Sequence, residues 1–356
     1  MNQERRRLHL VHGPTPIVRR LALDELVGAK VWVKRDDMTG GAEAGNKIRK
    51  LEFILADALA QNAEAVITCG GIQSNHARAT SLVCAQLGLR AILFLRVADP
   101  ERARRSQLDL VGNVLLDRMA GAEIGFVSPD EYRERNAIME HACRELQVEG
   151  VKAYIVPEGG SNGLGALGYV EAMFETRRQI DLGLANHGQT FDVVAHACGS
   201  GGTAAGVALG AQHFGVARET WTFAVCDDRA TFAKTISRIA LELRGHMPEL
   251  PPLAFLEPAG RHAVAPEDHA RLIIDDRAKG PAYAVMDDDQ KRFLVEVTRT
   301  TGLVLDPVYT GKALYGVAQA VARGEIARDA NVLFLHTGGL PGLLAQGEEL
   351  RSMLGH

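Results

Sequence analysis

The sequence predicts an α/β fold built as two domains. Short apolar segments without strict polar alternation recur with helical patterns between them, as expected of parallel strands covered by helices on both faces. The segments lie at residues 65–68, 91–95, 124–127, 153–156, 192–195, 222–225 and 332–335. The chain of 356 residues is also long for one hydrophobic core, which favours two domains with a cleft between them.

Composition narrows the classes of partner. The 40 basic and 44 acidic residues are interspersed, so neither nucleic acid nor an anionic membrane is an expected partner. Five scattered cysteines without a CxxC pair argue against a disulfide framework and a zinc site, and no metal is predicted. Because the chain shows no apolar run of membrane-spanning length and no signal-peptide pattern, we expect a cytoplasmic protein with a small-molecule substrate.

Glycine-rich turns indicate where a ligand site is to be sought. They cluster at residues 40–45, 70–71, 159–165, 199–202 and 338–342, and four of these clusters follow a predicted strand. In doubly wound sheets, ligands bind outside the carboxyl ends of the strands, where loops meet helix N-termini. These turns are therefore the first candidates for a binding site.

Lys47 lies at the start of a predicted amphipathic helix. Residues 45–52 read GNKIRKLE, and the apolar positions that follow recur at helical spacing. A lysine amine becomes a nucleophile when burial or a nearby cation disfavours its charged form, and we expect Arg49 and Lys50 to supply such charge. On spacing alone a solvated helical lysine is the commoner case, so Lys47 is a candidate for Schiff-base chemistry and no more.

Two loops have the form of anion sites. Ser74 and Asn75 belong to the segment QSNH at 73–76, between a predicted strand and a helix, and Ser74 is a good N-cap candidate. The segment CGSGGT at 198–203 opens another helix, and its glycines allow the backbone to surround a phosphate. It lacks the lysine of a P-loop and the GxGxxG spacing, which favours a lone phosphate over a nucleotide. Each pattern alone is a weak indicator of an anion site, since capped glycine turns are common.

Two later segments supply hydroxyl groups. DPVYTGK at 306–312 contains Tyr309, and HTGG at 336–339 contains Thr337. A phenol can transfer a proton, and a threonine hydroxyl can meet a heterocycle nitrogen without requiring its protonation. These residue types fit such roles but fit ordinary loops equally well.

Six segments, taken together, match the motifs of one enzyme family. They are KRDD at 34–37, GNKIRKLE at 45–52, QSNH at 73–76, GLGALGY at 163–169, DPVYTGK at 306–312 and HTGG at 336–339. In order and spacing they resemble the D-cysteine desulfhydrase and 1-aminocyclopropane-1-carboxylate deaminase family. The resemblance covers nearly the whole chain. It implies a two-domain, tryptophan-synthase-β-like fold (fold type II), a pyridoxal 5'-phosphate cofactor and a homodimer.

The resemblance also implies domain boundaries and residue roles. Residues 1–50 and 163–356 match the larger cofactor-binding domain, and residues 51–162 match the smaller inserted domain. Lys47 matches the lysine that carries the cofactor as a Schiff base, Asn75 the partner of its 3-hydroxyl, and Thr337 the contact of its pyridine nitrogen. The phosphate cup matches Gly199, Ser200, Gly201, Gly202 and Thr203. The implied catalytic residues are Lys47, Ser74, Tyr283 and Tyr309, and the implied substrate contacts are Ser74, Asn75, His76, Tyr283, Tyr309 and Thr310.

The implied activity is α,β-elimination on a small β-substituted amino acid to give pyruvate and ammonia, as in D-cysteine desulfhydrase or L-cysteate sulfo-lyase. The deaminase branch of the family carries a glutamate after the tyrosine of the Asp-Pro-Val-Tyr motif, whereas this chain has Thr310, which disfavours the cyclopropane substrate. Relatives read Gly-Tyr-Gly-Val-Pro-Asn where residues 282–287 read AYAVMD, and Ala44 replaces a glycine. We therefore expect a reshaped pocket around the substrate side chain.

Three alternatives stay open on the sequence. They are 1-aminocyclopropane-1-carboxylate deamination, a β-replacement or racemase reaction on the same fold, and a catalytically silent protein that binds pyridoxal phosphate or an amino acid. Intact Lys47, Ser74, Asn75, Tyr283 and Tyr309 argue against the last.

Overall fold

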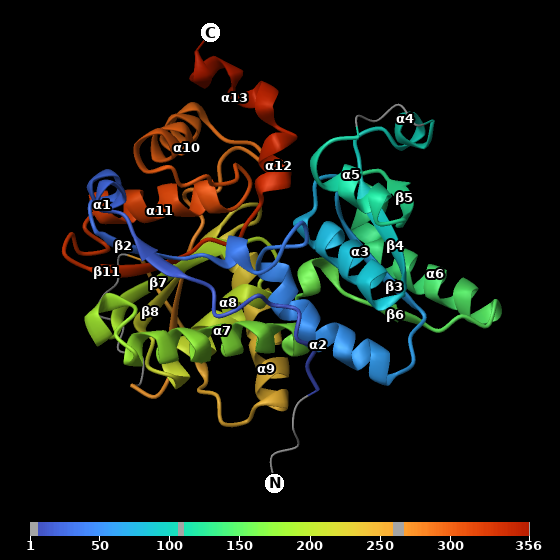
Figure 1. The fold of residues 1–356 in the computed structure, drawn as a ribbon, viewed down its shortest axis with the longest axis horizontal. Coiled ribbons are helices and arrows are strands. Elements are labelled where there is room, and N and C mark those ends of the chain that lie inside the picture. The colour runs from blue at the N-terminus through green and yellow to red at the C-terminus, as the bar shows by residue number, and fades with distance from the viewer. Residues whose placement is uncertain (1–5, 106–109, 259–266, 356) are drawn as a thin grey trace.

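Two sheets organise the molecule. The structure, a computed structural model, describes residues 6–105, 110–258 and 267–355. Its strands form a seven-stranded sheet, at the left of Figure 1, and a four-stranded sheet, at the right. All neighbouring strands run parallel except the first two of the chain. The predicted α/β class with mostly parallel sheets is confirmed.

The smaller sheet contains four of the predicted strands. Its order is β5-β4-β3-β6, with β3 Ala65–Gly71, β4 Arg90–Arg96, β5 Glu123–Val127 and β6 Ala153–Ile155. Its helices are α3 Asn75–Leu87, α4 Pro100–Arg104, α5 Gly112–Met119 and α6 Arg135–Val148, with a 3-10 turn η2 at Glu131–Glu134. Apolar residues of α3 and α5 pack on one face, and those of α6 pack on the other.

The larger sheet has the order β1-β2-β11-β7-β8-β10-β9. Its strands are β1 Ile17–Arg19, β2 Lys30–Lys34, β7 Phe191–Cys198, β8 Ala217–Ala224, β9 Leu253–Leu256, β10 Ala270–Asp275 and β11 Asn331–Leu335. The prediction found the central strands β7, β8 and β11 and missed the other four. All four lie at a sheet edge or next to one. β1 and β9 have only three and four residues, and charged residues flank the three central apolar positions of β2 and β10, so each offers only a short apolar run.

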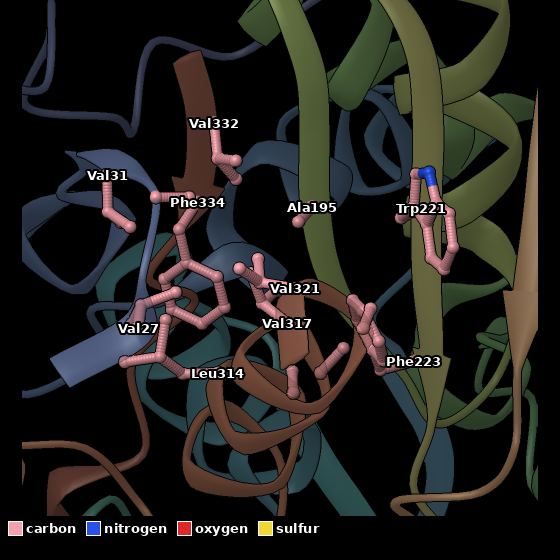
Figure 2. Packing of buried hydrophobic residues seen from close by; sticks show 14 of the residues in the cluster. Val27, Val31, Ala195, Trp221, Phe223, Leu314, Val317, Val321, Val332 and Phe334 are labelled. Carbon is pink, nitrogen blue, oxygen red and sulfur yellow. The ribbon is translucent and has the colours of Figure 1, made fainter. Parts of the chain in front are cut away.

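Helices cover both faces of the larger sheet. On one face lie α1 Leu21–Val27, α10 Asp288–Thr301 and α11 Thr310–Ala322, and on the other lie α7 Gly163–Asp181, α8 Gly202–His213 and α9 Arg229–His246. Figure 2 shows Leu314, Val317 and Val321 of α11 pointing toward the sheet residues Phe223 and Phe334. The chain ends with α12 Leu340–Leu344 and α13 Gly347–Leu354, and further 3-10 turns are η1 Asp36–Met38, η3 Glu158–Gly160 and η4 Asn186–Gly188.

Helix α2, Asn46–Ala60, belongs to both halves of the packing. Ile48 and Leu51 join the core of the smaller sheet, whereas Phe53 joins the core beneath α7 and α8. The predicted boundary at 50/51 falls inside this helix, and that at 162/163 falls at the start of α7. The division into domains stays a prediction.

A buried ionic network fixes the first turn of α2. The Nε and Nη2 atoms of Arg49 donate to the two carboxylate oxygens of Asp36 at 2.9 and 2.8 Å, and both side chains are buried. Arg49 also donates to Glu175 of α7 at 3.1 Å, and the Tyr169 hydroxyl donates to Asp36 at 2.9 Å. Burial alone would raise the pKa of Asp36, but the charge and hydrogen bonds of Arg49 outweigh it and lower that pKa.

Replacing Arg49 with Met is expected to lower the free energy of unfolding by about 3–5 kcal/mol, because Asp36 would stay buried without its partner. Denaturant-induced unfolding measures the loss. The matched control is Arg90→Met, which removes a pair with Glu123 whose side chains are 43% and 53% exposed. That variant should lose no more than about 1 kcal/mol. Equal losses in the two variants would contradict the importance of the network.

Candidate active site

A cavity of about 470 Å³ opens at the carboxyl ends of strands from both sheets. This volume lies within the range of ordinary small-molecule sites. Residues at or just after the ends of β3, β4, β7, β8 and β11 line it, namely Gly70, Gly71, Arg96, Cys198, Gly199, Cys226 and Thr337. The cavity thus gathers glycines that follow β6 and β7 or end β3, together with Thr337 after β11.

Most of the predicted site residues line this cavity. They are Lys47, Ser74, Asn75, His76, Gly199, Ser200, Gly201, Thr203, Tyr283, Tyr309 and Thr337. Gly202 and Thr310 are not among the lining residues. Both are buried: the Gly202 nitrogen donates to Ser161 Oγ at 3.3 Å, and the Thr310 hydroxyl donates to Asp306 at 2.6 Å.

Three helices direct their N-termini at the cavity. Helix α2 contributes Asn46 and Lys47, α3 contributes its cap Ser74 together with Asn75, and α8 contributes Thr203 of its first turn. Unpaired N–H groups at helix starts carry partial positive charge. The cavity is therefore suited to ligands that bear negative groups, such as a phosphate or a carboxylate.

Lys47 is half-buried in the first turn of α2. Burial lowers the pKa of its amine to about 8, against the opposing influence of Glu158 and Cys198. The neighbouring cation Arg49, expected to disfavour the charged amine, is instead paired with Asp36 and Glu175. Burial, more than Arg49, prepares this amine for nucleophilic or basic chemistry.

The loop before α3 is held by side-chain hydrogen bonds. Ser74 caps the helix as predicted, because its Oγ accepts from the Ala77 nitrogen at 3.2 Å. The Nδ2 atom of Asn113, on α5, donates to Gln73 O at 2.8 Å and to Asn75 Oδ1 at 3.1 Å. The side-chain oxygen of Asn75 is thus engaged, which orients its NH₂ group as a donor for a ligand.

His76 enters the cavity lining as a neutral side chain. Burial, together with Lys47 and Lys50, lowers its pKa well below the usual value. The Thr68 hydroxyl donates its only hydrogen to Val156 O at 2.8 Å and lies 2.9 Å from His76 Nε2. His76 Nε2 therefore carries the hydrogen, and Nδ1 is left as an acceptor without a partner among the described residues.

The start of α8 forms a cup with a polar floor. Gly201 adopts a φ of 84°, a conformation that favours glycine, and no side chain caps the helix. Below it, Ser161 Oγ lies 2.7 Å from Ser200 Oγ, and the Lys50 amine donates to Ser161 at 3.2 Å. The Gly202 nitrogen is bonded to Ser161, whereas Ser200, Gly201 and Thr203 line the cavity. Their donors beside a lysine amine match the needs of a phosphate.

Two tyrosines of the cavity lining, Tyr283 and Tyr309, form a hydrogen-bonded pair. The hydroxyls of Tyr283 and Tyr309 are 2.9 Å apart, and burial raises the pKa of both phenols, so both are neutral near pH 7. Tyr309 packs so closely on Gly199 that a Cβ there would lie 2.8 Å from its ring. Asp306 accepts from the Tyr309 nitrogen at 2.9 Å, and the Thr310 hydroxyl donates to the same carboxylate. Thr310 therefore holds Asp306 and, through it, the backbone of Tyr309.

Sequence reasoning missed several residues of the cavity and its supports. They are Asn46, Lys50, Arg96, Asn113, Tyr132, Glu158 and Ser161. Arg96 ends β4, and Glu158 follows β6, so the rule that ligands bind after strand ends could have identified them. Asn113 and Tyr132 carry no comparable signal, because only the packing of α5 and η2 brings them to the site.

Other kinds of site find no support in the described ranges. No helix of residues 6–105, 110–258 or 267–355 has the length and apolarity to cross a bilayer. Within the same ranges, no group of three or more histidine, cysteine or carboxylate side chains could hold a metal ion. The five cysteines are free thiols.

Comparisons with known proteins agree with this geometry. Residues 8–338 match the family model described as pyridoxal-phosphate dependent enzyme. A bifunctional D-cysteine desulfhydrase/1-aminocyclopropane-1-carboxylate deaminase of Arabidopsis thaliana is 37% identical over 98% of this chain and 81% of its own length. A putative 1-aminocyclopropane-1-carboxylate deaminase of Thermotoga maritima is 38% identical over 97% of this chain and 99% of its own.

Solved structures give the same fold. A crystal structure of a homologue of 1-aminocyclopropane-1-carboxylate deaminase superimposes with a TM-score of 0.82 at 33% identity, over 98% of this chain and 97% of that one. An L-serine ammonia-lyase of Rhizomucor miehei, 16% identical, shares the fold with a TM-score of 0.64 over 96% of this chain and 98% of its own. The tryptophan-synthase-β-like fold is confirmed, and the chain belongs to the family of pyridoxal-phosphate-dependent enzymes.

Proposed function

We propose that this enzyme catalyses α,β-elimination on a small β-substituted amino acid, releasing pyruvate and ammonia. The observation that carries the proposal is the meeting of Lys47, the open start of α3 and the Tyr283–Tyr309 pair around one cavity. This set provides a base, a carboxylate site and a proton donor. The names of the desulfhydrase and deaminase relatives support the same reaction class.

The residues around the cavity fit pyridoxal phosphate. Gly201 and Thr203, at the start of α8, line the cavity and would donate to the phosphate, and Lys50 lies behind them. Asn75, oriented by Asn113, offers an amide to the 3-hydroxyl, and the Thr337 hydroxyl is a neutral partner for the pyridine nitrogen. Lys47 is the amine that would hold the cofactor covalently.

When bound, the cofactor supplies an electron sink for the carbanion formed at the α-carbon. The chain does the proton transfers. The amine of Lys47 has a pKa of about 8, so it can take the α-proton at Nζ and give it up again near neutral pH. Its position on a helix held by the Arg49–Asp36 pair keeps that atom in place.

Different elements of the chain would bind the α-carboxylate and the leaving group of the substrate. Asn75 and His76, at the start of α3, line the cavity, and their N–H groups would receive the α-carboxylate. The neutral Tyr283 hydroxyl, hydrogen-bonded to Tyr309, would donate a proton to the leaving group. Burial of these groups limits water around the reacting atoms.

The purified enzyme should absorb at about 410–420 nm, the range of a lysine-bound pyridoxal cofactor, and should release pyruvate from a β-substituted alanine. D-Cysteine, L-cysteate and 1-aminocyclopropane-1-carboxylate are assayed separately, because the last identifies the deaminase alternative. Lys47→Ala should lose both the band and the pyruvate. A band without pyruvate from any of them would favour a replacement or racemase reaction, and no band after adding the cofactor would overturn the assignment.

The reactivity of Lys47 in cofactor-free protein should rise with pH through a midpoint of about 8. Below this pH the amine is protonated and unreactive, and above it the neutral nucleophile predominates. Acetylation by acetic anhydride over pH 6–11, quantified on the Lys47 peptide by mass spectrometry, gives the midpoint. A value near the ordinary lysine pKa of about 10.4 would show that burial does not tune this amine.

We further propose that the enzyme works as a cytoplasmic homodimer, as the family resemblance implies. Light scattering of the purified protein measures the mass in solution. A mass of one chain, 38.4 kDa, at micromolar concentration would rule the dimer out.

A further inference from the structure

Three arginines line the cavity, and Arg96 is the one without an ion-pair partner among the described residues. Arg135 pairs with Glu158 at 3.0 Å, and the exposed Arg133 pairs with Asp130 at 3.5 Å. Arg96, at the end of β4, forms neither a hydrogen bond nor an ion pair through its side chain with any residue that the structure describes. Its guanidinium has five N–H donors, and none of the described residues accepts from them.

Aromatic rings hold this guanidinium in place. Its central carbon lies 5.1 Å from the ring centre of Tyr132 and 5.4 Å from that of Tyr283. The Tyr132 hydroxyl donates to Glu158 at 2.7 Å, which fixes that ring. Stacking on aromatic faces restrains a guanidinium while leaving its edge free to donate. Because Arg96 is partly buried, an anion at that edge would be bound more strongly than at an exposed arginine.

The position of Arg96 places it near the group that the substrate side chain would contact. Arg96 lies opposite Gly71 in the pairing of β4 with β3, and Tyr283 Cε1 lies 3.5 Å from the Cβ position of Gly71. Arg96 is therefore a neighbour of the tyrosine proposed to protonate the leaving group. The α-carboxylate already has the start of α3, and the phosphate has the start of α8, so neither needs this arginine.

We propose that Arg96 binds an acidic group on the β-carbon of the substrate, a sulfonate that is also the leaving group. A β-carboxylate cannot leave with the bonding electrons and serves as its non-reacting analogue. The proposal rests on the proposed function and names its substrate class. For a sulfonate, the Cα–H proton passes to Lys47, and the Cβ–S bond breaks with its electron pair on sulfur. The sulfite takes a proton from Tyr283 and leaves as bisulfite, so one proton is taken up by the enzyme and one is given. With one water, the aminoacrylate product becomes pyruvate and ammonium. Arg96 then neutralises charge in the bound substrate and on the departing group.

The two carboxylates of the cavity lining do not cancel this charge. Glu158 is engaged by Arg135 and by the Tyr132 hydroxyl. Asp227 is exposed on the loop after β8, where it accepts from the Cys226 thiol at 3.4 Å. Arg96 is the cation with unmet donors beside the tyrosine pair.

The test is a titration of the cofactor-loaded enzyme, followed by the change in cofactor absorbance. Both enantiomers of aspartate are compared with asparagine, and both of cysteate with serine. The wild type should bind the acid at least about 10-fold more tightly than the neutral partner of each pair. Arg96→Gln should weaken acid binding about 10- to 100-fold and neutral binding less than about 3-fold, and Arg96→Lys should restore part of the loss.

Arg133→Gln is the matched control, because it removes the same charge at the cavity mouth from an arginine that is 80% exposed. It should change either affinity less than about 3-fold. Equal affinities of the wild type for acid and neutral ligands would overturn the proposal, as would equal losses for both in Arg96→Gln, which would assign Arg96 to the α-carboxylate. If no substrate yields pyruvate, the proposed elimination fails, while the titration still decides the role of Arg96.

Discussion

The buried pair between Arg49 and Asp36 is the constraint on which the site depends. Arg49 lies two residues after Lys47 on the first turn of α2, so the bonds that fix one also fix the other. The partners Asp36 and Glu175 come from distant parts of the chain and connect η1, α2 and α7. An ion pair in such surroundings is retained only when its geometry and extra hydrogen bonds repay desolvation. Here Tyr169 and Thr15 supply those bonds.

The electrostatics of the cavity come from backbone as much as from side chains. Three helix starts, at α2, α3 and α8, bring partial positive charge to one volume without burying three cations. Burial beside this cavity lowers the pKa of the Lys47 amine to about 8. One arrangement therefore favours anionic ligand groups and a neutral amine, the two conditions that an amino-acid enzyme with a phosphate-bearing cofactor requires.

Each sheet contributes a different part of the site. The larger sheet and its loops provide the open start of α8, Thr337 and the Tyr283–Tyr309 pair. The smaller sheet provides the start of α3 after β3 and Arg96 at the end of β4. Groups that would contact the cofactor thus come largely from one sheet, and groups that would contact the substrate side chain come from both. Changes at the end of β4 could alter substrate preference while the cofactor contacts stay the same.

The sequence by itself determined the class of fold, the central strands and the glycine turns that line the cavity, because these depend on local apolar runs and on turn chemistry. The motif around Lys47 and the cap at Ser74 are local signals too, and family resemblance added Tyr283. Only the tertiary structure decided that Thr310 supports Asp306 and does not line the cavity, and that Asn113 orients Asn75. It also left the Arg96 side chain without a hydrogen-bond or ion-pair partner among the described residues. These contacts join residues far apart in the chain. They arise from burial and packing between elements, which leave no local pattern in the sequence.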